Sequence, residues 1–345
     1  MVKGNNSGFI SNFTRDTFKG KRIIVWGDFI LDEYIVTSTG RVSREAPVLV
    51  TEYEESGFML GGAGNVVNNI KSLGAEPIPV GFIGSDEDGD RIKKFFSDLD
   101  IDTNHLLSPN NFRTPRKSRI LSGRDDSRKQ QVLRIDYLNK LTPKVEFYRK
   151  LSDELKSVLR NADLLLVSDY LKESVRADLF SDVINEYPKL ISVVDSRDNL
   201  SKFKNASYVT PNEPEIKNLF PTKRFTSKED FFDAGSELMS KLNCRGILQK
   251  RGNKTMIVFE EGTSPVEIDN YGTSDIVDVT GAGDTVISVL SLSLASGAGF
   301  YDSAVTSNIG ASIVVMKEGA YPLNGEELSS EVTAYSSKKN SDNNE

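Results

Sequence analysis

The alternation of apolar runs with amphipathic segments after residue 145 constrains the fold more than any other feature of the sequence. The runs at 163–170, 190–197 and 245–252 are typical of buried strands, and the segments at 146–162 and 176–187 have the spacing of amphipathic helices. Strands that alternate with helices usually form a mostly parallel sheet. The sequence therefore predicts an α/β protein with a doubly wound, mostly parallel sheet and helices on both faces.

Other segments outside this rhythm predict a second, smaller sheet. Residues 47–56 alternate polar and apolar side chains, as an exposed antiparallel strand does. Residues 117–123 and 130–137 have the pattern of a β-pair around a charged loop. Residues 22–28 have the pattern of a buried strand that ends in Gly-Asp, as expected where a parallel strand delivers side chains to a site.

The chain of 345 residues is long enough to bury a large core. Its last segment is polar and of low complexity, which is typical of disorder. We expect a flexible lead-in at 1–20, one domain at 21–327 whose small sheet comes from about 30–57 and 112–137, and a disordered tail at 328–345.

Composition excludes several classes of function. The net charge of -7 argues against a nucleic-acid-binding protein, and no apolar run approaches the roughly 20 residues that span a bilayer. Cys244 is the only cysteine, so no intrachain disulfide can form and we expect a cytoplasmic protein. His105 is the only histidine, which excludes paired-histidine zinc motifs, and we interpret it as structural. Chemistry must then come from carboxylates, backbone amides, lysine, arginine or a metal bound by oxygen.

The stretch DVTGAGDT, residues 278–285, is the strongest candidate for a reactive site. It lacks the lysine of a Walker A loop and the third glycine of a dinucleotide-binding fingerprint. Free N–H groups of Gly281, Ala282 and Gly283 at a helix N-terminus would attract an anion. Asp284 beside them would accept the proton of a hydroxyl that attacks phosphorus. The alternative is that Asp284 only caps an apolar helix after a glycine turn.

Three motifs in order give the chain a family resemblance: GGAGNVVNNIKSLGAEPIPVGFIG at 61–84, TPNEPE at 210–215 and DVTGAGDT. The chain resembles the PfkB (ribokinase-like) carbohydrate kinases over about residues 20–325. Within that family it is most similar to D-glycero-D-manno-heptose 7-phosphate kinases, including the kinase half of bifunctional ADP-heptose synthases. The segments that carry this similarity are GDFILDEY, GRVSREAPVLV, QQVLRIDY, VSDYLKE and VTGAGDTVISVLSLSLASG.

The resemblance implies a ribokinase-like fold with a β-sheet lid, and it implies roles for individual residues. Asp284 would be the catalytic base, with Gly281, Ala282 and Gly283 as the anion hole. Asn212 and Glu215 would organise Mg²⁺ and the nucleotide phosphates through water, although both could instead form a helix cap. The remaining implied positions are Lys250 and Asn308 for the nucleotide, Asp278 for a monovalent cation such as K⁺, and Asp32, Gly61, Gly62, Asn65, Asp169 and Lys172 for the sugar.

The basic island at 113–134 has two interpretations, a solvated loop or an anion-binding loop. The resemblance favours the second, because a 7-phosphate on the acceptor would need arginine or lysine partners, but the sequence does not choose among them.

The resulting hypothesis is an ATP- and Mg²⁺-dependent kinase that phosphorylates the anomeric hydroxyl of D-glycero-D-manno-heptose 7-phosphate. The resemblance also implies a homodimer joined through the lid sheet. The chain ends before the adenylyltransferase domain of the bifunctional relatives, so we expect at most the stand-alone kinase. The alternatives are a kinase of another sugar or sugar phosphate, such as fructose 6-phosphate, and a catalytically silent sugar-phosphate-binding protein.

Overall fold

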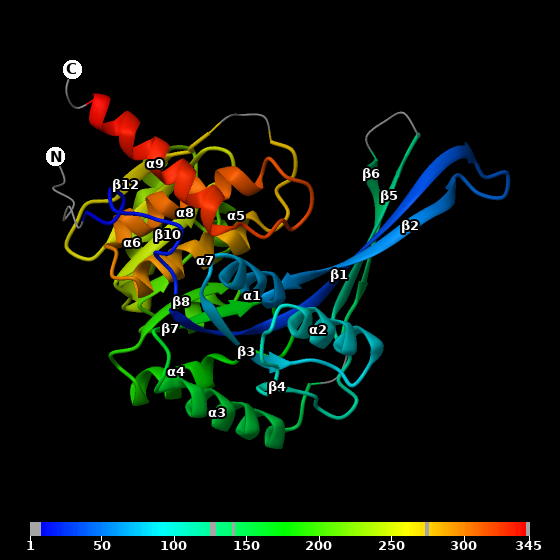
Figure 1. Cartoon of the computed structure of the whole chain (residues 1–345), viewed down its shortest axis with the longest axis horizontal. Helices are drawn as coiled ribbons and strands as arrows, with labels where there is room; N and C mark the ends of the chain where they lie inside the picture. Colours follow the sequence, from blue (N-terminus) through cyan, green and yellow to red (C-terminus); the bar gives the residue numbers. More distant parts are fainter. Residues whose placement is uncertain (1–7, 125–128, 140–141, 273–275, 343–345) are drawn as a thin grey trace.

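A single twisted sheet organises the chain (Figure 1). The structure, a computed structural model, describes residues 8–124, 129–139, 142–272 and 276–342. The sheet order is β12-β11-β10-β9-β8-β7-β1-β3-β4, with β2, β5 and β6 attached beyond β1. The strands are β1 (Arg22–Val42), β2 (Leu49–Gly62), β3 (Glu76–Phe82), β4 (Leu106–Leu107), β5 (Arg116–Gly123), β6 (Gln130–Tyr137), β7 (Leu164–Asp169), β8 (Ile191–Ser196), β9 (Tyr208–Val209), β10 (Gly246–Lys250), β11 (Thr255–Glu260) and β12 (Val266–Asp269).

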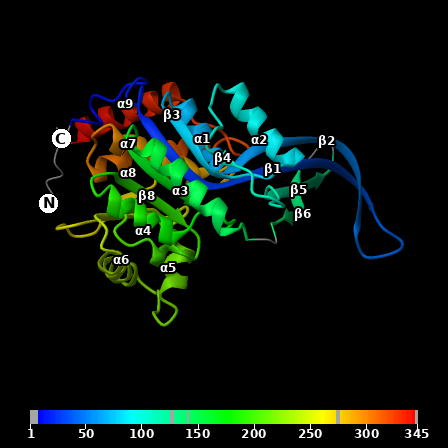
Figure 2. The same ribbon diagram turned by 90° about the horizontal axis from the view of Figure 1, so that it is seen from below.

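Helices cover both faces of the sheet, as the alternating pattern predicted (Figure 2). They are α1 (Ala63–Ser72), α2 (Glu87–Asp98), α3 (Val145–Leu159), α4 (Ala177–Glu186), α5 (Glu213–Leu219), α6 (Lys228–Leu242), α7 (Ala282–Ala295), α8 (Phe300–Val314) and α9 (Gly325–Asp342). One core packs α1, α2, α7, α8 and α9 on one face, and a second core packs α3, α4, α5 and α6 on the other. None of the described helices is long and apolar enough to cross a membrane.

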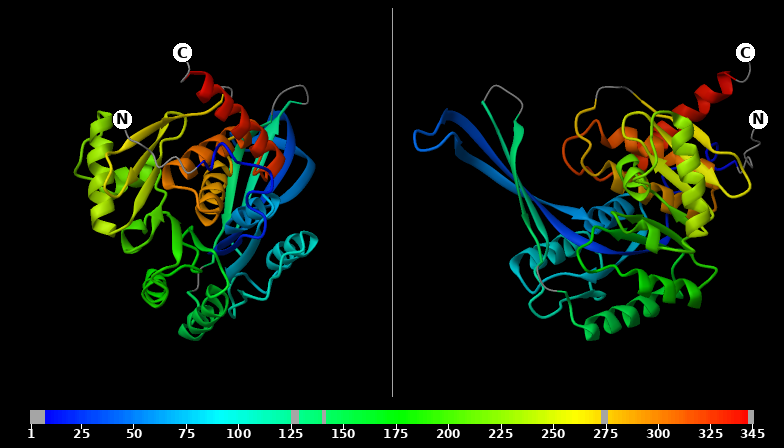
Figure 3. Two further views of the ribbon diagram at one scale, coloured as in Figure 1. Left: turned by 60° about the vertical axis from the view of Figure 1, so that its left-hand side comes forward. Right: turned by 180° about the vertical axis from the view of Figure 1, so that it is seen from behind.

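The central strand β1 belongs both to the main part of the sheet and to the smaller part formed with β2, β5 and β6. Residues 22–28 pair in parallel with β3 and β7, and residues 29–42 pair antiparallel with β2. The strand expected to end at Asp28 therefore continues into a lid, and the part beyond Asp28 is two thirds of its length. β5 pairs with β1 and β6, which completes a four-stranded lid that extends away from the helical body (Figure 3). The predicted antiparallel segments are confirmed, and β1 makes the lid continuous with the core.

The ends of the chain differ from the sequence-based prediction. α9 covers most of the tail predicted to be disordered from 328, and it buries Leu328 and Val332 against α8. The expectation of disorder followed the polar composition and overlooked these two apolar residues one helical turn apart. In the lead-in, Phe13 and Phe18 are buried in the same core, so the described part from residue 8 is packed and not free.

Candidate active site

Asp284 lies in the first turn of α7, where sequence analysis placed the reactive carboxylate. It is 7% exposed, and its two oxygens accept hydrogen bonds from Asn65 Nδ2 at 2.8 Å and from the Tyr170 hydroxyl at 2.9 Å. Burial raises the pKa of Asp284 to about 6, against the lowering effect of these two donors. The carboxyl group is therefore a proton acceptor that titrates close to neutral pH.

The turn before α7 requires glycine for two reasons. Gly281 has φ +79°, and a Cβ there would lie 2.7 Å from Asn65 Nδ2, the atom that donates to Asp284. Among the described residues, the N–H groups of Gly281, Gly283 and Asp284 have no hydrogen-bond acceptor, whereas that of Ala282 donates to the Val279 carbonyl. Free amides therefore lie beside Asp284 at the start of α7, with that of Ala282 engaged, and their role as an anion hole stays a prediction.

A buried aspartate that the predicted site did not include holds the loop that carries Tyr170. Asp28 is 1% exposed and accepts hydrogen bonds from the backbone N–H groups of Tyr170, Lys172 and Ser174, each at 2.8–2.9 Å. Burial and the neighbouring Asp169 raise the pKa of Asp28 to about 6, against the lowering effect of the three N–H donors. The loop after β7 is therefore fixed against β1, and the Tyr170 hydroxyl is fixed against Asp284.

Asp32 and the di-glycine of 61–62 meet at the base of the lid. Asp32 lies opposite Met59 in the β1–β2 ladder and forms an ion pair of 2.8 Å with Arg119 of β5. A Cβ on Gly61 would lie 2.5 Å from Asp32 Oδ2, so the missing side chain leaves room for this carboxylate. Together with Asn65 at the start of α1, these residues form the predicted sugar side of Asp284.

Asp169 and Lys172, also predicted for the sugar, have contacts within the protein. Asp169 accepts hydrogen bonds from the Ser196 hydroxyl and the Leu171 N–H, so its carboxylate ties β7 to β8. Lys172 contributes its backbone N–H to Asp28. Their role in sugar binding stays a prediction.

A cavity of about 580 Å³ opens on the other side of Asp284. Its lining combines apolar residues of α7 and α8 with polar ends of β10 and α5: Asn212, Lys250, Gly252, Met256, Ile276, Val279, Ala282, Gly283, Val286, Asn308, Ala311 and Val315. Three of the predicted nucleotide residues, Asn212, Lys250 and Asn308, line it. The Lys250 ammonium donates to Asp195 at 2.6 Å and lies near Gly283, while Asn308 donates to the Asp269 carbonyl.

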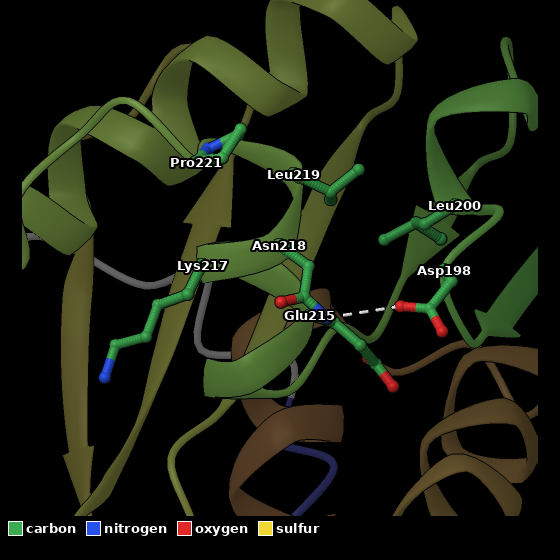
Figure 4. Close-up of a pocket in the computed structure, with 7 residues that line it drawn as sticks. All are labelled: Asp198, Leu200, Glu215, Lys217, Asn218, Leu219 and Pro221. Atoms are coloured by element: carbon green, nitrogen blue, oxygen red, sulfur yellow. Dashed lines mark hydrogen bonds between the residues drawn. The ribbon is translucent and has the colours of Figure 1, made fainter.

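Asn212 and Glu215 form a reciprocal capping box at the start of α5. The Asn212 side chain accepts from the Glu215 N–H, and the Glu215 carboxylate accepts from the backbone and side-chain N–H groups of Asn212. Burial raises the pKa of Glu215. The alternative reading of a helix cap is therefore correct for the structure, and the part of the pair in metal binding stays a prediction. Glu215 also borders a separate hollow of about 410 Å³ behind α5, where Asn218 donates to Asp198 (Figure 4).

Asp278 and His105 have protein partners. Asp278 accepts from the N–H and hydroxyl of Thr280 and from the Gly319 N–H, which fixes the loop before α7. Its proposed contact with a monovalent cation stays a prediction. His105 Nδ1 lies 2.7 Å from Glu154 of α3, which is consistent with a structural histidine.

Sequence reasoning missed Tyr170 as a partner of Asp284, although it had noted the strand end VSDY. It chose Asp169 and Lys172 there, because they follow the carboxyl end of a strand, where α/β sheets bind ligands. In the structure the Asp169 carboxylate and the Lys172 N–H bind within and around the loop, and the Tyr170 hydroxyl reaches Asp284.

The sequence of the chain matches that of the pfkB family carbohydrate kinases over residues 21–326. The chain belongs to the pfkB family. Membership makes it a sugar kinase, a phosphotransferase whose acceptor is an alcohol group. It is 32% identical over 326 residues to the bifunctional protein HldE of Desulfatibacillum aliphaticivorans, an alignment that covers 94% of this chain and 65% of that protein. It is 35% identical over 314 residues to the same-named protein of Citrifermentans bemidjiense, covering 90% and 63%.

The chain thus spans just under two thirds of the length of these relatives. Solved structures show the ribokinase-like fold of the kinase. Arabidopsis thaliana ribokinase complexed with ribose and ATP has a TM-score of 0.72 at 19% identity, covering 91% of this chain and 99% of that one. Phosphofructokinase-2 from Escherichia coli in complex with potassium has a TM-score of 0.74 at 16% identity, covering 92% and 99%.

Gly281→Ala tests the geometry of the site against a matched control. The new Cβ must push Asn65 away from Asp284, so we expect kcat to fall about 10- to 100-fold, because catalytic groups displaced by about 1 Å lose that much. Gly297 at the other end of α7 also has a positive φ, but its Cβ would meet nothing within 4 Å. Gly297→Ala should cost about 1 kcal/mol in urea unfolding and leave kcat unchanged. Equal kcat values for the two variants would contradict the proposed contact.

Asp284→Asn tests the raised pKa through stability. Between the ordinary pKa of 3.8 and about 6, the folded state holds a proton that the unfolded chain has released, so wild-type stability falls as pH rises. The amide carries no charge, and the variant should therefore gain about 2–3 kcal/mol on the wild type at pH 8 but little at pH 4. Urea unfolding at both pH values measures this, with the exposed Asp153→Asn as control. A gain that is the same at both pH values would refute the shift.

Proposed function

We propose that this chain is an ATP- and Mg²⁺-dependent kinase that phosphorylates the anomeric hydroxyl of D-glycero-D-manno-heptose 7-phosphate, giving the 1,7-bisphosphate. The observation that carries the proposal is the buried Asp284, with a pKa of about 6, between free helix amides and a large cavity. The bifunctional HldE relatives support the acceptor, since they agree with the resemblance of the sequence to heptose 7-phosphate kinases.

In this mechanism the acceptor hydroxyl lies against Asp284 and attacks the γ-phosphorus. The new bond joins the acceptor oxygen to phosphorus, the bond from phosphorus to the ADP oxygen breaks, and the hydroxyl proton passes to Asp284. Charge on the transferring group is stabilised by the N–H groups of Gly281 and Gly283 and by the positive end of the α7 dipole. The transition state is loose, so a carboxylate of this basicity is a sufficient base.

The cavity beside Asp284 suits the nucleotide. Met256, Ile276, Val279 and Ala311 offer an apolar slot for a purine, and Asn308 provides an amide at its wall. Lys250 lines the cavity near Gly283. Its ammonium group donates to Asp195 and would also bind the β- and γ-phosphates of the nucleotide.

The residues present also suit a magnesium ion that stays largely hydrated. Within the described ranges no group of three His, Cys, Asp or Glu side chains is arranged to hold a metal directly. Mg²⁺ in phosphoryl-transfer sites typically keeps several waters and uses one or two carboxylates plus phosphate oxygens. Glu215 with Asn212 would hold it through water, and when bound it would neutralise charge on the phosphates.

Asp284→Asn is the direct test of catalysis. Loss of the base should lower kcat by about 10²–10⁴-fold, the usual contribution of general-base catalysis. ATP binding should be unchanged, because Asp284 does not line the nucleotide cavity. ADP release is measured across heptose 7-phosphate, fructose 6-phosphate and their unphosphorylated sugars, and ATP binding by calorimetry. In the wild type, kcat/KM should also fall as the pH drops through about 6. Retained turnover in the variant would refute the role of Asp284.

We also propose a homodimer joined through the lid. Large apolar side chains are exposed on its strands and their connections, among them Val48, Leu49, Tyr53, Leu133 and Ile135, and such a concentration is typical of an interface. A charge at Leu133 should dissociate the dimer, because a carboxylate buried without a partner is costly. Sedimentation velocity of Leu133→Asp, with the exposed Val145→Asp of α3 as control, measures it. A monomeric wild type, or a dimeric Leu133→Asp, would contradict the proposal.

A further inference from the structure

The lid strands β5 and β6 carry four of the eight cations in the basic island at 113–134. Carboxylates neutralise four cations of the island at ion-pair distance: Arg116 by Glu33 and Asp88, Arg119 by Asp32, Lys129 by Glu54 and Arg134 by Asp136. Arg116 is also 4.1 Å from the centre of the Tyr137 ring. These side chains hold the lid together and to α2, and they are not available to a ligand without breaking those pairs.

Lys117 differs from its neighbours in β5. It is partly buried, and within the described part of the chain no carboxylate lies within ion-pair distance of its ammonium group. Burial lowers its pKa, and the nearby Arg197 and Arg119 lower it further, against the attraction of Asp32 and Asp284. Burying an ammonium group without a counter-ion costs free energy. An anion bound beside Lys117 would offset this cost.

Arg197 lies near the same tyrosine as Lys117. Lys117 Nζ is 5.1 Å from the centre of the Tyr170 ring, and the Arg197 guanidinium carbon is 4.7 Å from it. Arg197 follows β8, is exposed, and likewise has no carboxylate at ion-pair distance among the described residues. Two unpaired cations from different elements therefore converge on the residue whose hydroxyl contacts Asp284.

The two cations lie apart from the nucleotide side. Neither lines the 580 Å³ cavity, whose lysine is Lys250. Lys117 instead pairs in register with Asp32 of β1, on the predicted sugar side of Asp284. An anion held here would belong to the acceptor and not to the donor.

We infer that Lys117 and Arg197 bind the phosphate monoester of the acceptor sugar. Lys117 lies on strand β5 and Arg197 follows strand β8. The two cations would therefore donate charge-assisted hydrogen bonds from two directions, which suits the three oxygens of a phosphate. The inference deepens the proposed function, because it rests on a sugar acceptor that is already phosphorylated and names the residues that select it. An unphosphorylated sugar would leave both charges unpaired.

The test compares Lys117→Gln and Arg197→Gln with the wild type on a sugar phosphate and on the same sugar without phosphate. Each variant should raise KM for the phosphorylated acceptor about 10- to 100-fold, the value of one hydrogen bond to a charged group. kcat and KM for ATP should change little. Lys150→Gln is the matched control, since Lys150 lies 5.6 Å from the Phe147 ring on the distant helix α3.

The outcomes separate this inference from the proposed function. If the wild type transfers phosphate but the variants lose the phosphorylated and plain sugars equally, or lose ATP affinity instead, the subsite is wrong and the kinase stands. If the wild type releases no ADP with any sugar phosphate, the proposed acceptor is wrong. In that case calorimetric binding of fructose 6-phosphate, weakened in both variants and not in Lys150→Gln, supports the subsite, and unchanged binding overturns it.

Discussion

The buried carboxylate of Asp28 is the interaction on which the site depends. It accepts three backbone N–H groups from a loop in which Leu171 and Glu173 adopt positive φ of 59° and 79°. Such conformations are unfavourable for residues with side chains and persist only where the surroundings impose them. Asp28 lies at the point where β1 leaves the core for the lid, and its hydrogen bonds hold the residues on either side of these two. One residue therefore couples the lid strand, the loop after β7 and the Tyr170 hydroxyl on Asp284.

The charges around Asp284 are divided between two sides. Lys250 approaches from the cavity side and is held by Asp195, which also accepts from Thr210. Lys117 and Arg197 approach from the lid side and have no such partner. In the proposed reaction Lys250 attracts the nucleotide phosphates, whereas Lys117 and Arg197 together attract the phosphate of the acceptor. The two reactants would then approach the same carboxylate from different sides, as a transfer between two phosphorylated molecules requires.

Much of the fold followed from the sequence because its signals are local. The apolar strands β7, β8 and β10 and the amphipathic helices α3 and α4 depend on neighbouring residues and were predicted, whereas β12 and α6 were not. The course of β1 was not, because nothing local distinguishes a strand that ends at Asp28 from one that continues into a second sheet. Similarly, Asp284 and its amides were found from one motif, whereas Tyr170, Lys117 and Arg197 come together only through tertiary packing. The polar tail was misjudged because two apolar residues suffice to dock a helix.

The contacts of Asp284 raise the question of how a substrate hydroxyl reaches it. Both oxygens already accept a hydrogen bond, from Asn65 and from Tyr170. A carboxylate has about four acceptor positions, so a hydroxyl can bind as a third donor without displacing either one. The two donors then act as positioning groups, because they fix the plane of the carboxylate and leave its remaining lone pairs in defined directions. Their hydrogen bonds also oppose the effect of burial on the pKa, which keeps Asp284 ionisable near neutral pH. The same contacts that orient the carboxylate thus also lower its pKa against the effect of burial.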